Sequence, residues 1–240
     1  MSPRLALLAL VLPVALSGCA TDRAHVNDRV KFSTSAYGAA ASPRVTRSRN
    51  VPRGGGRALV GRPYKIRGRW YEPKLEPGYD RYGQASWYGP NFHGRKTANG
   101  EIYDQYALSA AHPTMPLPSY ARVTNIQTGK STIVRVNDRG PYHGARVIDL
   151  SGAAAERLGY RHVGTAPVRV QYIGPAPLHA RDRKYLKRSL RSYDPKKLAA
   201  AKARRGANRR ARTTLASRFL FSYRARRAGN AAAEALENVR

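Results

Sequence analysis

Three side chains near the middle of the chain have the chemistry of an acid/base site. Glu101 follows the turn sequence TANG, His112 lies in SAAHPT, and Asp138 lies in NDRGP. A carboxyl group can give a proton to a sugar oxygen and take one back, and an imidazole can tune that carboxyl group through a hydrogen bond. Asp138, Glu101 and His112 are therefore the candidate catalytic residues, for chemistry on a sugar substrate.

Residues 80–175 hold six carboxylates, and some of them have an expected structural place. Glu156 would lie on the polar side of a helix, Asp149 or Ser151 would cap that helix, and Asp80 lies at the edge of the segment. The carboxylates that remain are Glu101, Asp104 and Asp138.

The residues alone leave structural roles open for each candidate. Glu101 would also suit a solvated turn, and Asp138 would suit an Asx-turn. A histidine before proline, as at position 112, is commonly structural. Catalytic groups nevertheless concentrate on loops that a rigid scaffold positions, which is where Glu101 and Asp138 are expected.

The other histidines of this segment do not indicate a metal site. His93 and His143 lie in the Gly-bearing loops NFHGR and PYHGA and are expected at the rim of the site. The sequence has no HExxH spacing of the kind that holds zinc on a helix. We expect neither a metal nor another cofactor.

Short strands separated by turn residues must position these side chains. Two alternating runs, 120–125 and 132–137, flank Thr128-Gly129 and predict a hairpin with one buried face. The sequence also predicts strands at 85–88 and 168–173, a tight turn at Asn99-Gly100, and a helix at 151–158 that ends at Gly159. Many short strands with abundant Gly and Pro predict a mainly β fold, a small closed barrel.

The motifs between residues 84 and 151 resemble one known family. QASWYG, KTANGE, ALSAAHP, VRVNDRGP and VIDLS follow one another in the order found in the rare lipoprotein A family, and more distantly in the first domain of plant expansins. The resemblance covers about residues 80 to 174. It implies a six-stranded double-psi β-barrel with one or two short helices, flanked by disordered basic segments.

The resemblance also implies an activity. Members of this family are endolytic lytic transglycosylases, which cleave the β-1,4 bond between N-acetylmuramic acid and N-acetylglucosamine and leave 1,6-anhydro ends. They prefer glycan strands that lack stem peptides. Asp138 would then be the acid/base, Glu101 would stabilise positive charge or share the proton work, and His112 would accompany the pair.

The same motifs imply residues that bind the glycan. Tyr88 of the WYG motif would line a groove, because Trp87 faces the other side of the strand, and Tyr142 would form a second wall. The remaining implied contacts are Thr97, Asn137 and Arg139. The alternative function is a non-catalytic, expansin-like lipoprotein that binds or tethers the wall.

The first residues predict export. Arg4 precedes an apolar run at residues 5–16 that Pro13 interrupts. This run is shorter than the roughly 20 residues that span a bilayer, and it predicts a cleaved signal peptide at residues 1–18.

The signal ends in LSGC, which resembles the bacterial lipobox. Cys19, the single cysteine of the chain, would receive the lipid and become the first residue of the mature protein. Ala20 in place of an acidic residue favours the outer membrane, with the domain on the periplasmic face. An ordinary signal peptide that contains a chance cysteine is the alternative.

Positive charge gathers outside the barrel segment. The formal net charge is +30, and residues 181–240 hold 19 basic and 4 acidic side chains against 11 and 6 in residues 80–175. An exported protein meets anionic lipids and wall polymers, so we expect attraction to these and no nucleic-acid partner. A merely solvated tail is the alternative.

Composition divides the chain into a signal peptide and four further parts. Residues 19–60 are rich in Ser, Ala, Arg and Gly and predict a flexible tether, because they offer little apolar surface to bury. Residues 61–79 would form an arm or edge hairpin against the barrel at 80–175. Residues 176–240 would be a basic Ala/Arg-rich tail, disordered or partly helical, in which no glycan-binding repeat domain is expected.

Overall fold

The computed structural model describes residues 41–208. The predicted signal peptide at 1–18, the lipidation of Cys19 and the last part of the basic tail lie outside the described residues. In the part of the chain that is described, no helix is both long enough and apolar enough to cross a membrane.

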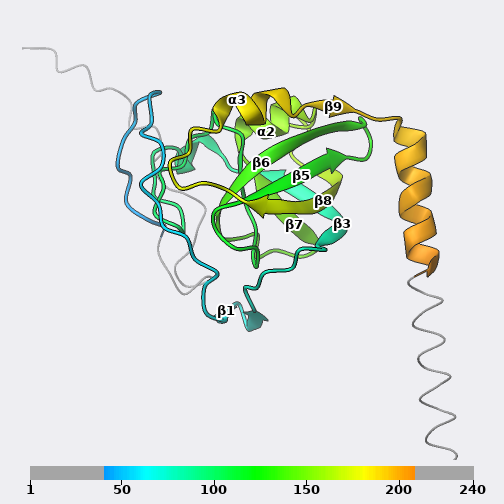
Figure 1. The fold of residues 1–240 in the computed structure, drawn as a ribbon, viewed down its shortest axis with the longest axis horizontal. Coiled ribbons are helices and arrows are strands. Elements are labelled where there is room, and N and C mark those ends of the chain that lie inside the picture. Colours follow the sequence, from blue (N-terminus) through cyan, green and yellow to red (C-terminus); the bar gives the residue numbers. More distant parts are fainter. Residues whose placement is uncertain (1–40, 209–240) are drawn as a thin grey trace, which may run out of the picture.

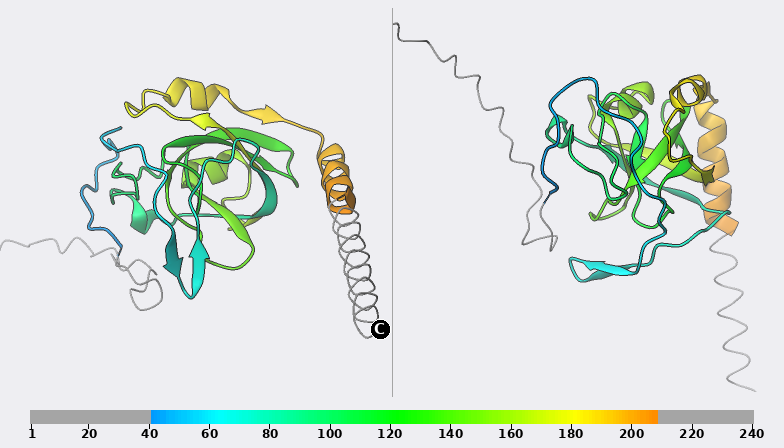
Figure 2. Two further views of the ribbon diagram at one scale, coloured as in Figure 1. Left: turned by 60° about the horizontal axis from the view of Figure 1, so that its bottom comes forward. Right: turned by 60° about the vertical axis from the view of Figure 1, so that its left-hand side comes forward.

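Six strands form a closed barrel at the centre of the molecule (Figure 1). Around the barrel their order is β4, β7, β3, β8, β5, β6, and a β4–β6 pairing closes the ring, which is seen end-on in Figure 2. Two neighbouring pairs, β3–β7 and β4–β6, are parallel, and the others are antiparallel. The bounds are β3 Asp80–Trp87, β4 Ser109–Ala111, β5 Ser119–Asn125, β6 Lys130–Asp138, β7 Arg146–Leu150 and β8 Ala166–Pro175. The predicted six-stranded double-psi β-barrel is confirmed.

Alternating side chains fill the barrel. Val123 on β5, Val134 and Val136 on β6, and Val170 on β8 are all fully buried. Successive residues of a strand point to opposite faces, so each strand sends every second side chain inward. These inward side chains form an aliphatic core of small residues.

The predicted hairpin and helix are both present. β5 and β6 pair across a turn in which Gly129 has φ +71°, a backbone conformation that L side chains rarely adopt. Helix α2 spans Gly152–Arg157, and Ser151 caps it by accepting a hydrogen bond from the Ala154 N–H at 3.2 Å. Ser151, and not Asp149, is therefore the cap.

A small hairpin projects from the barrel, at the bottom of the view in Figure 1. Its strands are β1, Tyr64–Ile66, and β2, Arg69–Tyr71 (Figures 1 and 2). The rings of Tyr64 and Tyr71 stack with centroids 5.3 Å apart, and both meet the ring of Tyr142 edge-on. This aromatic contact fixes the hairpin next to the loop that follows β6, as the predicted arm requires.

Residues 41–60, which we predicted as part of a flexible tether, contact the barrel loops in this structure. Arg44 donates hydrogen bonds to the carbonyls of His93 at 2.6 Å and Asn91 at 2.9 Å. The Val45 N–H bonds to the Gly94 carbonyl, and Leu59 pairs with Leu117. Backbone hydrogen bonds to the barrel loops order this segment, and they are contacts that its composition does not reveal.

The tail was predicted to be disordered or partly helical, and its described first part is partly helical. Helix α3, Arg183–Arg188, and strand β9, Arg191–Ser192, lie against β6, and Leu186 is buried in the core. The Ser189 hydroxyl accepts from the Ile133 N–H at 2.8 Å. A short 3-10 helix, η1 at Pro90–Phe92, and a helical stretch at 195–208 complete the described elements.

Candidate active site

Asp138 lies at the end of β6, where the chain leaves the barrel. Its Oδ1 accepts hydrogen bonds from the backbone N–H groups of Ala98 and Arg139, each 2.8 Å long. Burial raises the pKa of Asp138 to about 6, against the opposing effect of these two N–H groups and of the Arg139 charge. Because Oδ1 is occupied as an acceptor, the proton is carried by Oδ2, and it exchanges near neutral pH.

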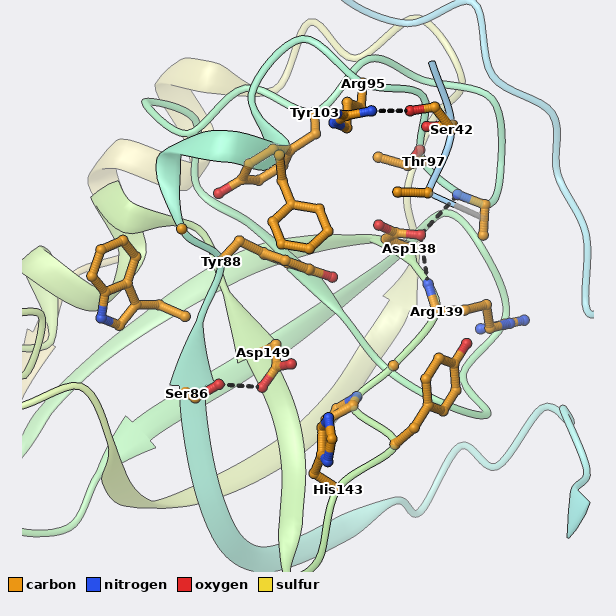
Figure 3. Close-up of a pocket in the computed structure, with 18 of the residues that line it drawn as sticks. Ser42, Ser86, Tyr88, Arg95, Thr97, Tyr103, Asp138, Arg139, His143 and Asp149 are labelled. Atoms are coloured by element: carbon orange, nitrogen blue, oxygen red, sulfur yellow. Dashed lines mark hydrogen bonds between the residues drawn. The ribbon is translucent and has the colours of Figure 1, made fainter. Parts of the chain in front are cut away.

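The Asp138 side chain lines a cleft of about 550 Å³ that is walled by aromatic rings (Figure 3). The Tyr88 ring lies 5.5 Å from that of Phe92 and 5.0 Å from that of Tyr103, measured between centroids. The Tyr88 hydroxyl is buried and points toward Asp138 (Figure 3), and its hydrogen bonding to that carboxyl group opposes the rise in the Asp138 pKa. The aromatic wall and the carboxyl group thus lie side by side in the cleft.

Asp149 is a second carboxyl group in the same cleft (Figure 3). It accepts a 2.7 Å hydrogen bond from the Ser86 hydroxyl, and Arg146 lies 3.5 Å away. Burial raises the pKa of Asp149, while the Arg146 charge and the Ser86 bond oppose that rise. The cleft therefore contains two partly buried carboxyl groups with raised pKa values.

Asp149 was predicted as a helix cap and not as a site residue. The alternation of side chains along strand β7 is the sequence pattern that indicates its position in the cleft. Ile148 and Leu150 are both fully buried in the barrel, so Asp149 between them must face the opposite way. Parallel pairing of β7 with β3 then sets Asp149 opposite Ser86.

Glu101 does not reach this cleft. Its carboxylate is buried on the other side of the turn at 97–100 and pairs with Arg135, whose Nη2 lies 2.6 Å from Oε1. The side-chain amides of Asn99 and Asn137 each donate a further bond of 2.9 Å. Burial alone would raise the pKa of Glu101, but these donors and the Arg135 charge hold it below its usual value. These contacts favour the ionised form of Glu101.

The position of Glu101 still affects Asp138. The Asn99 side chain bonds to Glu101 and accepts a 2.8 Å bond from the Thr97 hydroxyl, which holds the turn. The Ala98 N–H that bonds to Asp138 belongs to this turn. The predicted pair of acids is therefore connected through the backbone of this turn.

His112 is buried in the loop behind Asp138 and does not contact its carboxyl group. Its Nδ1 accepts from the N–H groups of Thr114 at 3.1 Å and Met115 at 3.0 Å, so Nε2 carries the hydrogen and donates to the Tyr79 hydroxyl at 2.9 Å. Burial lowers the pKa of His112 to about 3. Burial thus favours the neutral imidazole, whose Nε2 faces the Tyr79 hydroxyl and not a carboxyl group. Its predicted part in the chemistry stays a prediction.

The predicted glycan-binding residues divide into two groups. Tyr88, Thr97 and Tyr142 line the cleft, as does Arg139. The Arg139 guanidinium, however, donates to three backbone carbonyls, those of His112, Met115 and Val60. Asn137 lies outside the cleft lining and bonds to Glu101. Arg139 and Asn137 thus order the site, a role that their sequence motif does not distinguish from binding.

Within the described residues, no group of three or more His, Cys, Asp or Glu side chains is arranged to hold a metal ion. His93 belongs to the support of the cleft, since its Nε2 lies 3.0 Å from the Ser48 carbonyl. His143 does lie on the cleft rim.

The fold and the cleft define a double-psi β-barrel domain with a carboxyl site at one end. Residues 81–170 match the family model described as "Lytic transglycolase". This match confirms the family resemblance that the motifs between residues 84 and 151 predict.

Relatives with assigned names agree with that match. The chain is 56% identical over 119 residues to the endolytic peptidoglycan transglycosylase RlpA of Neisseria meningitidis serogroup A, covering 49% of this chain and 50% of the relative. It is 59% identical over 114 residues to the protein of the same name in Pseudomonas aeruginosa, covering 47% and 33%. The chain thus spans half or less of the length of these two relatives. A solved structure of apo Clavibacter michiganensis expansin has a TM-score of 0.33 and 18% identity, covering 41% of this chain and 53% of that one.

Proposed function

We propose that the protein is an endolytic lytic transglycosylase of peptidoglycan, which cleaves the bond between N-acetylmuramic acid and N-acetylglucosamine and leaves a 1,6-anhydro end. One observation carries the proposal. Asp138 presents a buried carboxyl group, with its pKa raised to about 6, to a cleft large enough for sugar rings. A carboxyl group that exchanges its proton near neutral pH suits general acid/base catalysis.

In the first half of the reaction Asp138 acts as an acid. The proton on Oδ2 passes to the glycosidic oxygen of the leaving N-acetylglucosamine, and the bond from that oxygen to the muramyl anomeric carbon breaks. The carboxylate that results is stabilised by the Ala98 and Arg139 N–H groups on Oδ1. Positive charge develops on the muramyl ring, and Asp149 is the second carboxyl group placed in the cleft to stabilise it.

In the second half Asp138 acts as a base. The muramyl C6 hydroxyl attacks the anomeric carbon of its own ring, and its proton returns to Asp138. No water is consumed, so the products gain no atoms. The Tyr88 hydroxyl, which points to the same carboxyl group, is the donor or acceptor placed to orient the reacting hydroxyl.

The relatives support the assignment. Each of the two carries the name endolytic peptidoglycan transglycosylase, and their identity to this chain exceeds 50% over the matched segment.

The test is product analysis. The protein is incubated with peptidoglycan glycan strands and the products are resolved by mass spectrometry. We expect 1,6-anhydro ends from the wild type and a loss of at least about 100-fold in rate for Asp138→Asn, the lower range of general acid/base effects. Glu156→Gln is the matched control, because this acid lies on the exposed face of α2 with 68% of its side chain accessible.

Other products would overturn the proposal in distinct ways. Reducing ends instead of anhydro ends would make the protein a hydrolase. Strand binding without any cleavage would favour a wall-binding lipoprotein without catalysis.

We also propose that Cys19 carries the lipid that anchors the protein at the periplasmic face of the outer membrane. The sequence LSGC supports this anchor. Cys19→Ser should abolish labelling by a radioactive fatty acid and leave the precursor uncleaved, as seen by mass spectrometry. Unchanged labelling would refute the anchor.

A further inference from the structure

A second pocket adjoins the cleft, between the β1–β2 hairpin and the barrel. Its volume is about 440 Å³, and it shares Pro141, His143 and Arg146 with the cleft lining. A ligand that fills the cleft can therefore continue into this second pocket. The hairpin lies before the matched residues 81–170, so the family match does not account for it.

The pocket is lined mainly by cations. Arg69, Lys74, Arg81 and Arg146 face it, with Glu72 as the carboxylate among its lining residues. Arg81 pairs with Glu76 at 3.0 Å and Arg146 approaches Asp149 at 3.5 Å. For Arg69 and Lys74 no ion pair is found within residues 41–208. The excess positive charge favours an anionic ligand.

The pocket also offers aromatic surface. Trp70 is 62% exposed, an unusual position for so large an apolar side chain, and Lys65 lies 5.9 Å from its ring centroid. Tyr79 and Tyr82 line the opposite wall. An exposed indole beside cations is suited to stacking on a sugar ring that carries a negative group.

The hairpin is held rigidly enough to serve as a wall. The Tyr64 hydroxyl donates to the Pro113 carbonyl at 2.8 Å, and the Tyr71 ring packs edge-on against the ring of Tyr142 at 5.4 Å. Because Tyr142 also lines the cleft, the two pockets share one aromatic support.

We propose that this second pocket is a subsite for the free carboxylate of a muramyl residue in the glycan strand. The inference rests on the proposed function, which places such a strand in the cleft. Removing the stem peptide exposes this carboxylate, whereas in intact strands an amide bond to the peptide masks it. The subsite therefore gives a physical reason for a preference for strands without stem peptides.

The experiment measures strand binding by the full chain, with Asp138→Asn added so that the strands stay intact. The ligands are glycan strands without stem peptides, the same strands after chemical amidation of their carboxylates, and neutral β-1,4 N-acetylglucosamine oligomers. We expect Lys74→Gln with Arg81→Gln to weaken binding of the carboxylate form roughly fivefold, as expected for partly exposed ion pairs. Binding of the amidated and neutral ligands should change less than twofold.

Two further variants complete the test. Trp70→Ala should weaken binding of all three ligands, since stacking does not depend on charge. Lys184→Gln with Arg188→Gln removes the same charge from α3, at the opposite end of the molecule (Figure 1), and should leave all three affinities unchanged.

Equal loss for carboxylate and amidated strands, or no loss for either, would overturn the subsite. Failure of the proposed function is a separate result, because it would appear as absent 1,6-anhydro products from the wild type.

Discussion

At the scale of single residues, the three predicted catalytic side chains differ in how their surroundings shift their pKa values. Burial raises the pKa of Asp138 to about 6, an ion pair holds that of Glu101 low, and burial lowers that of His112 to about 3. These surroundings favour ionised Glu101 and neutral His112, and we propose that Asp138 is the one of the three that cycles a proton.

This difference predicts a pH profile. The reaction begins with protonated Asp138, whose fraction falls as the pH rises through about 6. We expect kcat to decline above that pH, about tenfold for each further unit, until another step limits it. Initial rates of anhydro-end formation between pH 4.5 and 8.5 check this. A rate that is flat from pH 6 to 8 would contradict Asp138 as the acid.

Asp138→Asn should change stability in a pH-dependent way. The folded pKa of Asp138 lies above its unfolded value of 3.8, so ionisation at neutral pH destabilises the wild type, and the cost disappears as the pH falls to about 4. The asparagine variant avoids this cost, so it should be more stable by about 2 kcal/mol at pH 7.5 and equal near pH 4. Urea unfolding at both pH values measures the difference, and a variant that is less stable at pH 7.5 would count against a buried, ionisable carboxyl group.

Glu101→Gln tests positioning against proton transfer. The change breaks a buried ion pair with Arg135 and should cost about 3 kcal/mol of unfolding free energy. Activity should fall because the turn that presents the Ala98 N–H loosens, while the pH dependence keeps its decline above about 6. If this decline disappeared in the Glu101→Gln variant, the result would instead show that Glu101 exchanges protons. Glu156→Gln should alter neither measurement.

At the scale of elements, the sequence predicts well wherever a local pattern decides the structure. Alternation and a turn glycine predicted the β5–β6 hairpin, and Ser151 was among the predicted helix caps. The sequence does not predict contacts between segments that lie far apart in the chain. Nothing near Glu101 in the sequence indicates Arg135 as its partner. The position of Asp149 before a helix is typical of a cap, and only the pairing of β7 with β3 shows that its side chain faces the cleft.

The segment 41–46 illustrates the same limit and can be tested by itself. It lies over the loop at 91–96, with Ala41 and Ser42 lining the cleft. Arg44→Ala removes two hydrogen bonds to that loop, so we expect faster proteolysis within this segment and about 1 kcal/mol less unfolding free energy. Arg57→Ala is the control, because this exposed side chain belongs to the same stretch of residues 41–60. Equal cleavage rates in both variants would show that Arg44 does not hold the segment.

At the scale of the whole molecule, the folding unit is larger than the barrel. Arg44 bonds to the loop at 91–93, Asp182 pairs with Arg135 at 3.1 Å and Leu186 is buried, so the domain extends past residues 80–175 at both ends. A fragment of residues 80–175 should therefore be less stable than one of residues 41–192 by at least about 3 kcal/mol, because it loses the buried Leu186 side chain and the ion pair of Arg135 with Asp182. Thermal and urea unfolding of the two fragments decides this, and equal stability would refute the extended unit.

The first and last barrel strands are hydrogen-bonded neighbours. β3 and β8 run antiparallel, with Asp80 opposite Gln171, so the chain enters and leaves the barrel at nearly the same point. A domain whose ends lie together can be inserted into a surface loop of another protein, or have its ends joined and new ends opened elsewhere, with little distortion. New chain connections can thus be made at this point of the barrel, provided that the packed segments 41–60 and 176–192 stay with it, since Ala41 and Ser42 line the cleft.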